Sequence, residues 1–159
     1  MLGEGAYGQV FKALNLRDGG FLAVKIMKIP NYNPNDKKSL QIMSKLEKEI
    51  TLLKNLKHKN IVQYYDSCIV NESEVNIFME FMSGGSIQSM CKQFDQLDES
   101  VIRNFTKQLL EGLDFLHQNH VIHADLKGAN ILYDGKKNVK LSDFGAARYI
   151  ENLPMLSAS

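Results

Sequence analysis

Residues 123–130 read HADLKGAN, and this stretch contains the pattern H-x-D-L-x-x-x-N. A second short pattern, DFG at residues 143–145, begins 18 residues after Asp125 (143 − 125 = 18). Asn130 and Asp143 carry hard oxygen donors of the kind that Mg²⁺ prefers. Either pattern alone can arise by chance, so the rest of the chain has to decide what they mean.

A glycine-rich stretch, GEGAYGQV at residues 3–10, fits G-x-G-x-x-G-x-V. Glycines let a backbone turn tightly and bring its N–H groups against phosphate oxygens, which a Cβ would obstruct. On this pattern alone, a dinucleotide-binding turn and an ordinary glycine-rich hairpin are rival interpretations. A dinucleotide site needs a strand before the glycines and a helix directly after them. Here a strand and a turn follow and G-K-[ST] is absent, which favours a loop between two strands over a nucleotide.

Lys25 lies in a short apolar strand, 17 residues after Gly8 (25 − 8 = 17). A lone lysine in such a strand is usually a surface side chain with a buried stem. Glu49 is likewise most often a solvated helix carboxylate, but it lies between Leu46 and Ile50 and therefore borders an apolar stripe. It could face the strand that carries Lys25, and a carboxylate there would hold the lysine in one rotamer.

Apolar periodicity predicts the elements of the first half of the chain. Hairpin-linked strands are expected at residues 9–13 and 21–26, with a loop at 30–39. A helix is expected at about 40–56, and further strands at 61–67 and 75–81. The residues on the helix's apolar stripe are Leu46, Ile50, Leu53 and Leu56.

The second half begins with a connector at residues 83–86 and a helix at 100–117. Short strands are expected at 121–123, 131–133 and 139–141. The apolar face of the helix is expected to hold Ile102, Phe105, Leu109, Leu113 and Leu116.

The ordered set of five motifs resembles that of eukaryotic protein kinases, and the resemblance covers nearly the whole chain. It implies an α+β fold in which an antiparallel β-sheet N-lobe with one helix is joined by a hinge to a helical C-lobe. The N-lobe would span residues 1–82, and the hinge and a partial C-lobe residues 83–159. The chain ends inside what the resemblance makes the activation loop, before an A-P-E segment, so an incomplete kinase is expected.

The resemblance also implies the chemistry, which is transfer of the ATP γ-phosphate to a protein hydroxyl. Asp125 would orient the substrate hydroxyl and accept its proton, with Lys127 beside the transferring phosphate. A lysine at this position is typical of serine/threonine kinases. Asn130 and Asp143 would hold Mg²⁺, and Lys25, gripped by Glu49, would contact the phosphates.

The remaining implied roles concern nucleotide binding and packing. The phosphate loop would use its three glycines, Gly3, Gly5 and Gly8. The hinge, after Met79, would use backbone groups at Glu80 and Met82. The adenine ring would lie between the apolar side chains of Val10, Ala23 and Leu132. A stacked spine of Leu53, Tyr64, His123 and Phe144 would link the lobes, although simple core packing equally predicts that these are buried.

Three phrases are most similar to MAP kinase kinase kinases of the STE group: LLKNLKHKNIV (52–62), FMEFMSGGSI (78–87) and KGANIL (127–132). This implies phosphorylation of Ser or Thr on a downstream protein kinase, a MAP kinase kinase. One departure is Ala124, where most such kinases have an arginine that pairs with a phosphorylated activation loop. We therefore expect activation to depend less on loop phosphorylation. The alternative function is an inactive, pseudokinase-like ATP-binding or scaffold module.

The overall composition narrows the partners. The chain has 159 residues, 44% hydrophobic and 23% charged, with a formal net charge of +1. This balance argues against nucleic acid or an anionic membrane as the main partner. Cys68 and Cys91 are isolated, which suggests free thiols and a cytoplasmic location.

Overall fold

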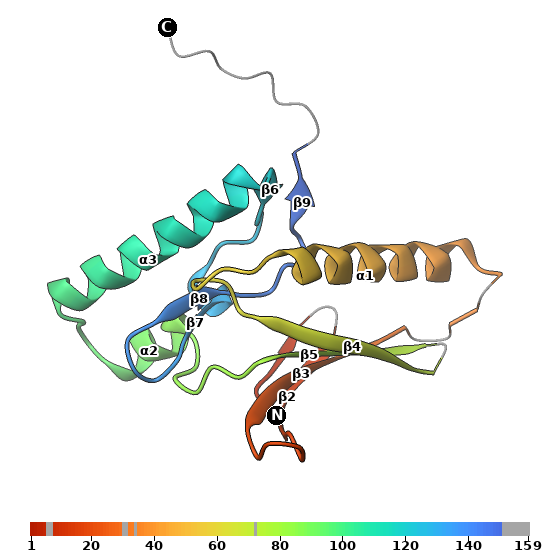
Figure 1. The fold of residues 1–159 in the computed structure, drawn as a ribbon, viewed down its shortest axis with the longest axis horizontal. Coiled ribbons are helices and arrows are strands. Elements are labelled where there is room, and N and C mark those ends of the chain that lie inside the picture. The colour runs from red at the N-terminus through yellow and green to blue at the C-terminus, as the bar shows by residue number, and fades with distance from the viewer. Residues whose placement is uncertain (6–7, 30–31, 34, 72, 151–159) are drawn as a thin grey trace, which may run out of the picture.

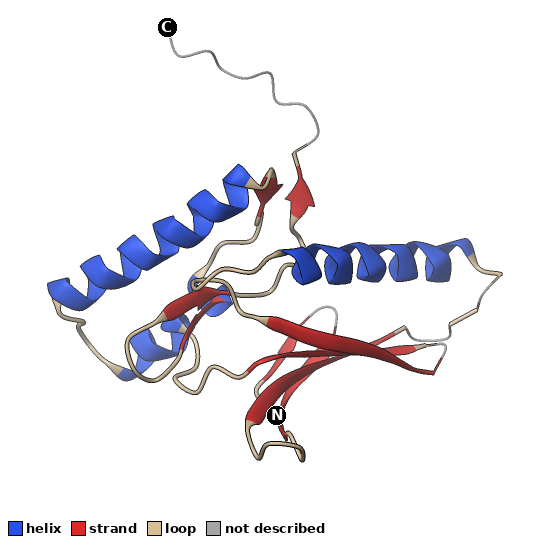
Figure 2. Ribbon diagram, in the orientation of Figure 1, coloured by secondary structure: helices blue, strands red, loops and turns tan. Residues whose placement is uncertain are grey.

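Five antiparallel strands form the sheet of the first half of the molecule (Figures 1 and 2). The computed structural model describes residues 1–5, 8–29, 32–33, 35–71 and 73–150. The strands are β1 (Gly3–Gly5), β2 (Gly8–Leu14), β3 (Phe21–Lys28), β4 (Tyr64–Asn71) and β5 (Glu74–Glu80), in the spatial order β1-β2-β3-β5-β4. The predicted hairpin of residues 9–13 and 21–26 is confirmed, and Gly19, with a φ of 73°, turns the chain between its strands.

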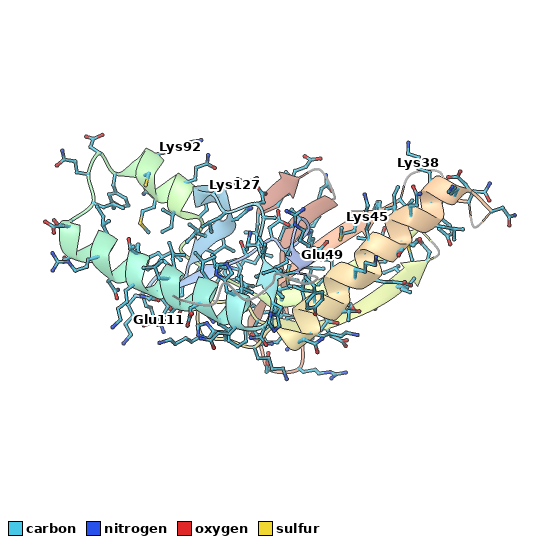
Figure 3. All side chains as sticks on the ribbon, turned by 90° about the horizontal axis from the view of Figure 1, so that it is seen from above. Lys38, Lys45, Glu49, Lys92, Glu111 and Lys127 are labelled. Atoms are coloured by element: carbon cyan, nitrogen blue, oxygen red, sulfur yellow. The ribbon has the colours of Figure 1, made fainter. Side chains whose placement is uncertain are left out.

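Helix α1 (Lys37–Asn55) lies across one face of this sheet (Figures 1 and 3). It begins three residues before the predicted start, inside the expected loop, because the Asp36 side chain caps it by accepting from the Ser39 N–H at 2.9 Å. Of the predicted stripe, Leu46, Leu53 and Leu56 are buried, and Ile50 is half-buried. The stripe is wider than predicted because Leu52 is buried as well.

The predicted strand at residues 61–67 is wrong in its first half, because β4 begins only at Tyr64. Ile61 instead forms a parallel bridge with Leu141. The Val62 N–H donates to the Leu141 carbonyl at 2.9 Å, and the Leu141 N–H donates to the Asn60 carbonyl at 2.9 Å. This segment therefore pairs with the second half of the chain before it enters the sheet.

Residues 83–150 of the second half contain two α-helices and two two-stranded sheets. Its elements are α2 (Ile87–Gln93), α3 (Glu99–Gln118), β6 (Val121–Ile122), a 3₁₀ turn (Gly128–Asn130), β7 (Ile131–Tyr133), β8 (Val139–Leu141) and β9 (Arg148–Tyr149), with β6 paired to β9 and β7 to β8. Helix α3 is confirmed, but Ile102 is 49% exposed and does not join the predicted apolar face. In the first turns of α3, Val101 and Phe105 pack against the core instead, and the side of α3 that carries Ile102 is left exposed.

The connector after β5 is anchored to the β7–β8 hairpin. The Gly84 N–H donates to the Tyr133 carbonyl at 2.9 Å, and the Tyr133 N–H donates to the Gly85 carbonyl at 2.8 Å. A Cβ on Gly84 would lie 2.3 Å from a Tyr133 ring atom, so only glycine allows this approach. The connector is thus packed against the second half of the chain.

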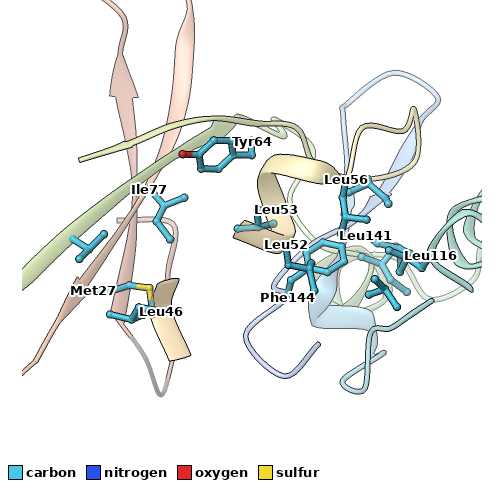
Figure 4. Close-up of a cluster of buried hydrophobic side chains, with 14 of the residues drawn as sticks. Met27, Leu46, Leu52, Leu53, Leu56, Tyr64, Ile77, Leu116, Leu141 and Phe144 are labelled. Atoms are coloured by element: carbon cyan, nitrogen blue, oxygen red, sulfur yellow. The ribbon is translucent and has the colours of Figure 1, made fainter. Parts of the chain in front are cut away.

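One hydrophobic core spans both halves of the molecule (Figure 4). Leu52 and Leu56 at the end of α1 lie close to Phe144 and to Leu141 of β8, and Leu116 of α3 completes this group. Leu116 and Leu141 are both fully buried. Burying a side chain of this size contributes roughly 1.5–3 kcal/mol, so the two halves stabilise each other.

Candidate functional site

Lys25, Glu49 and Asp143 meet between the sheet, α1 and the segment after β8. The Lys25 Nζ lies 2.9 Å from Glu49 Oε1 and 3.2 Å from Asp143 Oδ1. The Lys25 and Glu49 side chains are only 11% and 8% exposed, whereas that of Asp143 is 49% exposed. Figure 3 shows Glu49 on the side of α1 nearest the centre of the molecule. The predicted contact of Glu49 with Lys25 is thus present in the structure, and Asp143, which was singled out for a different role, joins it.

The ionisation of Lys25 reflects a balance of opposing effects. Burial by itself lowers the pKa of Lys25, but the charges of Glu49 and Asp143 and their hydrogen bonds raise it, and the net direction is upward. Lys25 therefore stays a cation at neutral pH inside a largely dry environment. An ammonium held in this way is suited to bind an anion that approaches from the exposed side of Asp143.

Asp125, Lys127 and Asn130 form a second cluster on the loop before β7. The Lys127 Nζ donates to Asp125 Oδ2 at 2.7 Å, and the Asn130 Nδ2 donates to the same oxygen at 3.0 Å. The hydrogen bond from Lys127, followed by that from Asn130, lowers the pKa of Asp125, and the bond to Asp125 raises the pKa of Lys127. Asp125 is therefore ionised at neutral pH and partly open to solvent.

Asn130 holds this loop in place through several hydrogen bonds. It is buried, its Nδ2 also donates to the Asp125 carbonyl at 2.8 Å, and its own carbonyl accepts from the N–H and the hydroxyl of Ser142. These bonds tie the loop to the segment that carries Asp143. Its Oδ1 is the acceptor of the amide group and is therefore the atom that would bind a cation.

Two residues of this region have a positive φ although they are not glycines. Ala124 has a φ of 61° and Asp143 a φ of 59°, a conformation that costs an ordinary residue about 1–2 kcal/mol. The neighbouring side chains hold them there, since His123 and Phe144 are each 2% exposed and their rings lie 4.9 Å apart. The His123 Nε2 also lies 2.9 Å from the Ser142 carbonyl oxygen. His123 is thus a packing residue, which keeps Asp143 turned toward the solvent.

The glycine-rich stretch comprises β1 and the first three residues of β2, and residues 6–7 are outside the described residues. Gly3 pairs with Val10, and Gly5 pairs with Gly8. Gly8 has a φ of 147°, and a Cβ there would lie 2.2 Å from the Ile26 carbonyl oxygen, so packing within the sheet requires glycine. A Cβ on Gly3 would meet no atom of the described residues within 4 Å. Contacts within this part of the chain therefore do not explain the glycine at position 3.

The residues expected around an adenine ring lie on more than one element. Val10 lies opposite Lys25, and Ala23 precedes Lys25 by two residues on β3, so these three share one face of the sheet. Leu132 comes from β7 and is half-buried. Met82 is buried in the connector. The predicted apolar residues thus come from one face of the five-stranded sheet, from β7 and from the connector.

Glu80 has a structural contact that the sequence did not indicate. Its N–H donates to the Gln63 carbonyl, its Oε2 accepts from the Gln63 N–H at 3.1 Å, and both carboxylate oxygens accept from the Lys140 Nζ. The motifs suggested only a backbone role for Glu80. No local pattern signals this pair, because Lys140 lies 60 residues away in the sequence.

Comparison with known proteins gives one family. A family model described as "Protein kinase domain" matches residues 1–158. Mitogen-activated protein kinase kinase kinase 3 of Mus musculus is 44% identical over 98% of this chain and 24% of its own length. Mitogen-activated protein kinase kinase kinase 2 of Arabidopsis thaliana is 42% identical over 100% and 24%, and mitogen-activated protein kinase kinase kinase A of Dictyostelium discoideum is 45% identical over 93% and 16%. The chain thus spans about a quarter or less of these relatives.

None of the described helices is both long enough and apolar enough to cross a lipid bilayer.

Proposed function

Because the chain belongs to the protein kinase family, we propose that it transfers the γ-phosphate of ATP to Ser or Thr hydroxyls of a protein substrate. The observation that carries this proposal is the meeting of Lys25 with Glu49 and Asp143, which lie 24 and 118 residues away in the sequence. A buried ammonium between two carboxylates, one of them half open to solvent, suits the binding of a metal-bound polyphosphate.

Lys25, Glu49 and the glycine-rich stretch bind the phosphates in this proposal. Glu49 fixes the ammonium of Lys25, so the cation is already oriented when the nucleotide arrives and little entropy is lost. The backbone N–H groups around Gly3, Gly5 and Gly8 would cover the phosphate oxygens. Among the described residues no atom lies within 4 Å of the Gly3 Cβ position, which is consistent with a close approach of a ligand there.

The residues present fit a magnesium ion. The Oδ1 of Asn130 and the carboxylate of Asp143 are hard oxygen ligands, and Mg²⁺ commonly takes one or two such ligands beside phosphate oxygens and water. When bound, the Mg²⁺–ATP complex supplies the transferable phosphoryl group and neutralises the charge on its oxygens. Lys25 would release one hydrogen bond to Asp143 so that this carboxylate could turn to the metal.

Asp125 receives the substrate hydroxyl. Its pKa is lowered mainly by the hydrogen bond from Lys127, so it remains a carboxylate that accepts a hydrogen bond from the hydroxyl at neutral pH. A carboxylate with a low pKa is a weak base, so Asp125 mainly orients the hydroxyl and takes its proton late in the transfer. Lys127 would then stabilise the negative charge of the transferring phosphoryl group.

Val10, Ala23 and Leu132 would enclose the adenine ring, and backbone groups at Glu80 and Met82 would bind its edge. Since the Glu80 N–H already donates to Gln63, the bond at that residue would use another backbone group. The names of the relatives support a MAP kinase kinase as the protein substrate. A cytoplasmic location stays a prediction.

The proposal is tested with the purified full-length protein, radiolabelled ATP, Mg²⁺ and a catalytically dead MAP kinase kinase as acceptor. Label on Ser or Thr of the acceptor supports the function. A thermal-unfolding scan with Mg²⁺–ATP separates the alternatives, because a ligand at about 100 times its dissociation constant adds roughly 2.7 kcal/mol of stability. Stabilisation without transfer would favour a nucleotide-binding scaffold, and the absence of both would overturn the proposal.

A further inference from the structure

Lys12 on β2 is held over two aromatic rings. Its Nζ lies 3.7 Å from the ring centroid of Phe21 and 4.7 Å from that of Phe81. The two rings are 6.1 Å apart and meet edge to face at 64°. An ammonium over the face of an aromatic ring is attracted to the ring's negative face, so the three side chains form one contact, which we name the Lys12 clamp.

The Lys12 clamp connects three elements. Lys12 lies in the middle of β2, Phe21 is the first residue of β3, and Phe81 directly follows β5 in the connector to the lower half. Phe21 remains 54% exposed and Lys12 is exposed. The contact therefore adds little to the core. Backbone pairing with β5 already places β3 beside the connector, so the main effect of the clamp is to hold β2 there.

The clamp lies on the face of the sheet that carries the proposed nucleotide site. Lys12 pairs with Ala23, and Val10 pairs with Lys25, so the four side chains share a face. Phe21 precedes Lys25 by four residues on the same strand, a distance of about 13 Å. Lys25 marks the phosphate end of the site, so the clamp lies at the opposite end, beside the residues proposed to enclose the base.

We propose that Lys12 is a positioning residue for the nucleotide, holding β2, which carries Gly8 and Val10, at the connector so that the base and phosphate ends of the site keep their spacing. This inference rests on the proposed binding of ATP. If the clamp breaks, β2 must be ordered by the nucleotide itself, and that cost reduces affinity. Lys12 contacts neither Asp125 nor Lys127, so the chemical step keeps its rate.

The test is steady-state phosphoryl transfer by the full-length protein with Lys12→Met, Lys12→Arg and Phe81→Leu. Lys12→Met keeps the apolar stem but removes the charge, and a contact of this kind at an exposed site corresponds to about a two- to five-fold change in affinity. We expect KM for ATP to rise by that factor while kcat stays within a factor of about two. Lys12→Arg should restore KM, because a guanidinium also stacks on aromatic rings.

The matched control is Lys28→Met, which removes an exposed lysine from the same strand as Phe21 but at its other end. Its KM for ATP should equal that of the wild type. In the double variant Lys12→Met/Phe81→Leu, the increase in KM should be smaller than the product of the single increases, because both remove one contact. Independent effects, or no difference between Lys12→Met and Lys28→Met, would overturn the role of Lys12. A wild-type protein that does not bind ATP would instead overturn the proposed function.

Discussion

Lys140 on β8 donates to both carboxylate oxygens of Glu80, at 2.8 and 2.7 Å, and so joins the end of β5 to the second half of the chain. The two side chains are 17% and 24% exposed. The pair is therefore better shielded from water and salt than the surface pair of Lys28 and Glu74.

Replacing Lys140 by Met should lower the free energy of unfolding by about 1.5–3 kcal/mol, the usual worth of a charge-assisted hydrogen bond. Within the described part of the chain, the Glu80 carboxylate then keeps the Gln63 N–H as its partner. Urea unfolding measures the change. In the double variant Glu80→Gln/Lys140→Met part of the loss should return, and Lys28→Met should stay within about 0.5 kcal/mol of the wild type. A Lys140→Met protein as stable as Lys28→Met would show that the contact is energetically silent.

Replacing Lys25 by Met or Asp143 by Asn should reduce kcat/KM by roughly 10²-fold or more, as expected when a preorganised charge is removed. Phosphoryl transfer to the protein acceptor measures this. Lys28→Met, in the same strand, is again the control. Activity within a factor of a few of the wild type for either variant would mean that these residues do not have the assigned roles.

The two ends of the glycine-rich stretch should respond differently to alanine. Gly8→Ala places a Cβ 2.2 Å from the Ile26 carbonyl oxygen, so the free energy of unfolding should fall by about 1–3 kcal/mol. Gly3→Ala meets no atom within 4 Å, so stability should stay within about 0.5 kcal/mol while the affinity for ATP falls. Calorimetric titration with ATP and urea unfolding separate the two effects. Unchanged ATP affinity in Gly3→Ala would argue against a close approach of phosphate there.

The β7–β8 turn should contribute a part of the acid sensitivity of the fold. Burial by itself raises the pKa of Asp134, but hydrogen bonds from the N–H groups of Asn138, Lys136 and Lys137 lower it below its usual value of 3.8. A carboxyl whose pKa is lower in the folded state adds stability above the unfolded pKa, and this is lost as the pH falls through the folded pKa. Asp134→Ala should therefore lose less stability than the wild type between about pH 5 and about pH 2. Urea midpoints across this range test it, with the exposed Asp95→Ala as control; parallel curves for wild type and Asp134→Ala would contradict the assignment.

Ala124 leads to a prediction about control of activity. It is exposed beside Asp125 and brings no charge that could pair with a phosphate. Ser157 belongs to the segment that the resemblance to kinases makes the activation loop, and it lies outside the described residues. We expect Ser157→Glu to leave kcat/KM nearly unchanged, and Ala124→Arg/Ser157→Glu to respond more strongly. A many-fold activation by Ser157→Glu alone would contradict this expectation.

Sequence reasoning worked best where chemistry restricts residue type and spacing. The family match and the names of the relatives confirm the resemblance to protein kinases and to MAP kinase kinase kinases. Helix α2 was missed because its seven residues, IQSMCKQ, are too few to repeat an apolar pattern, and Ile87 and Met90, which pack against the core, are only half-buried. The ion pair of Glu80 with Lys140 and the Lys12 clamp were missed because they depend on how strands align in space. Roles of the site residues in catalysis stay predictions.

The anchored connector has a practical consequence. Ser83 Oγ donates to the Asp134 carbonyl, and Gly84 and Gly85 form backbone hydrogen bonds with Tyr133. The connector is therefore bonded to the β7–β8 hairpin at three successive residues. Leu52 and Leu56 meanwhile lie in the same core as Leu116 and Leu141. A chain cleaved in this connector should therefore stay associated through these contacts without a covalent link. Two fragments that end and begin in the connector, expressed separately, would make a complementation reporter whose signal depends on their reassembly.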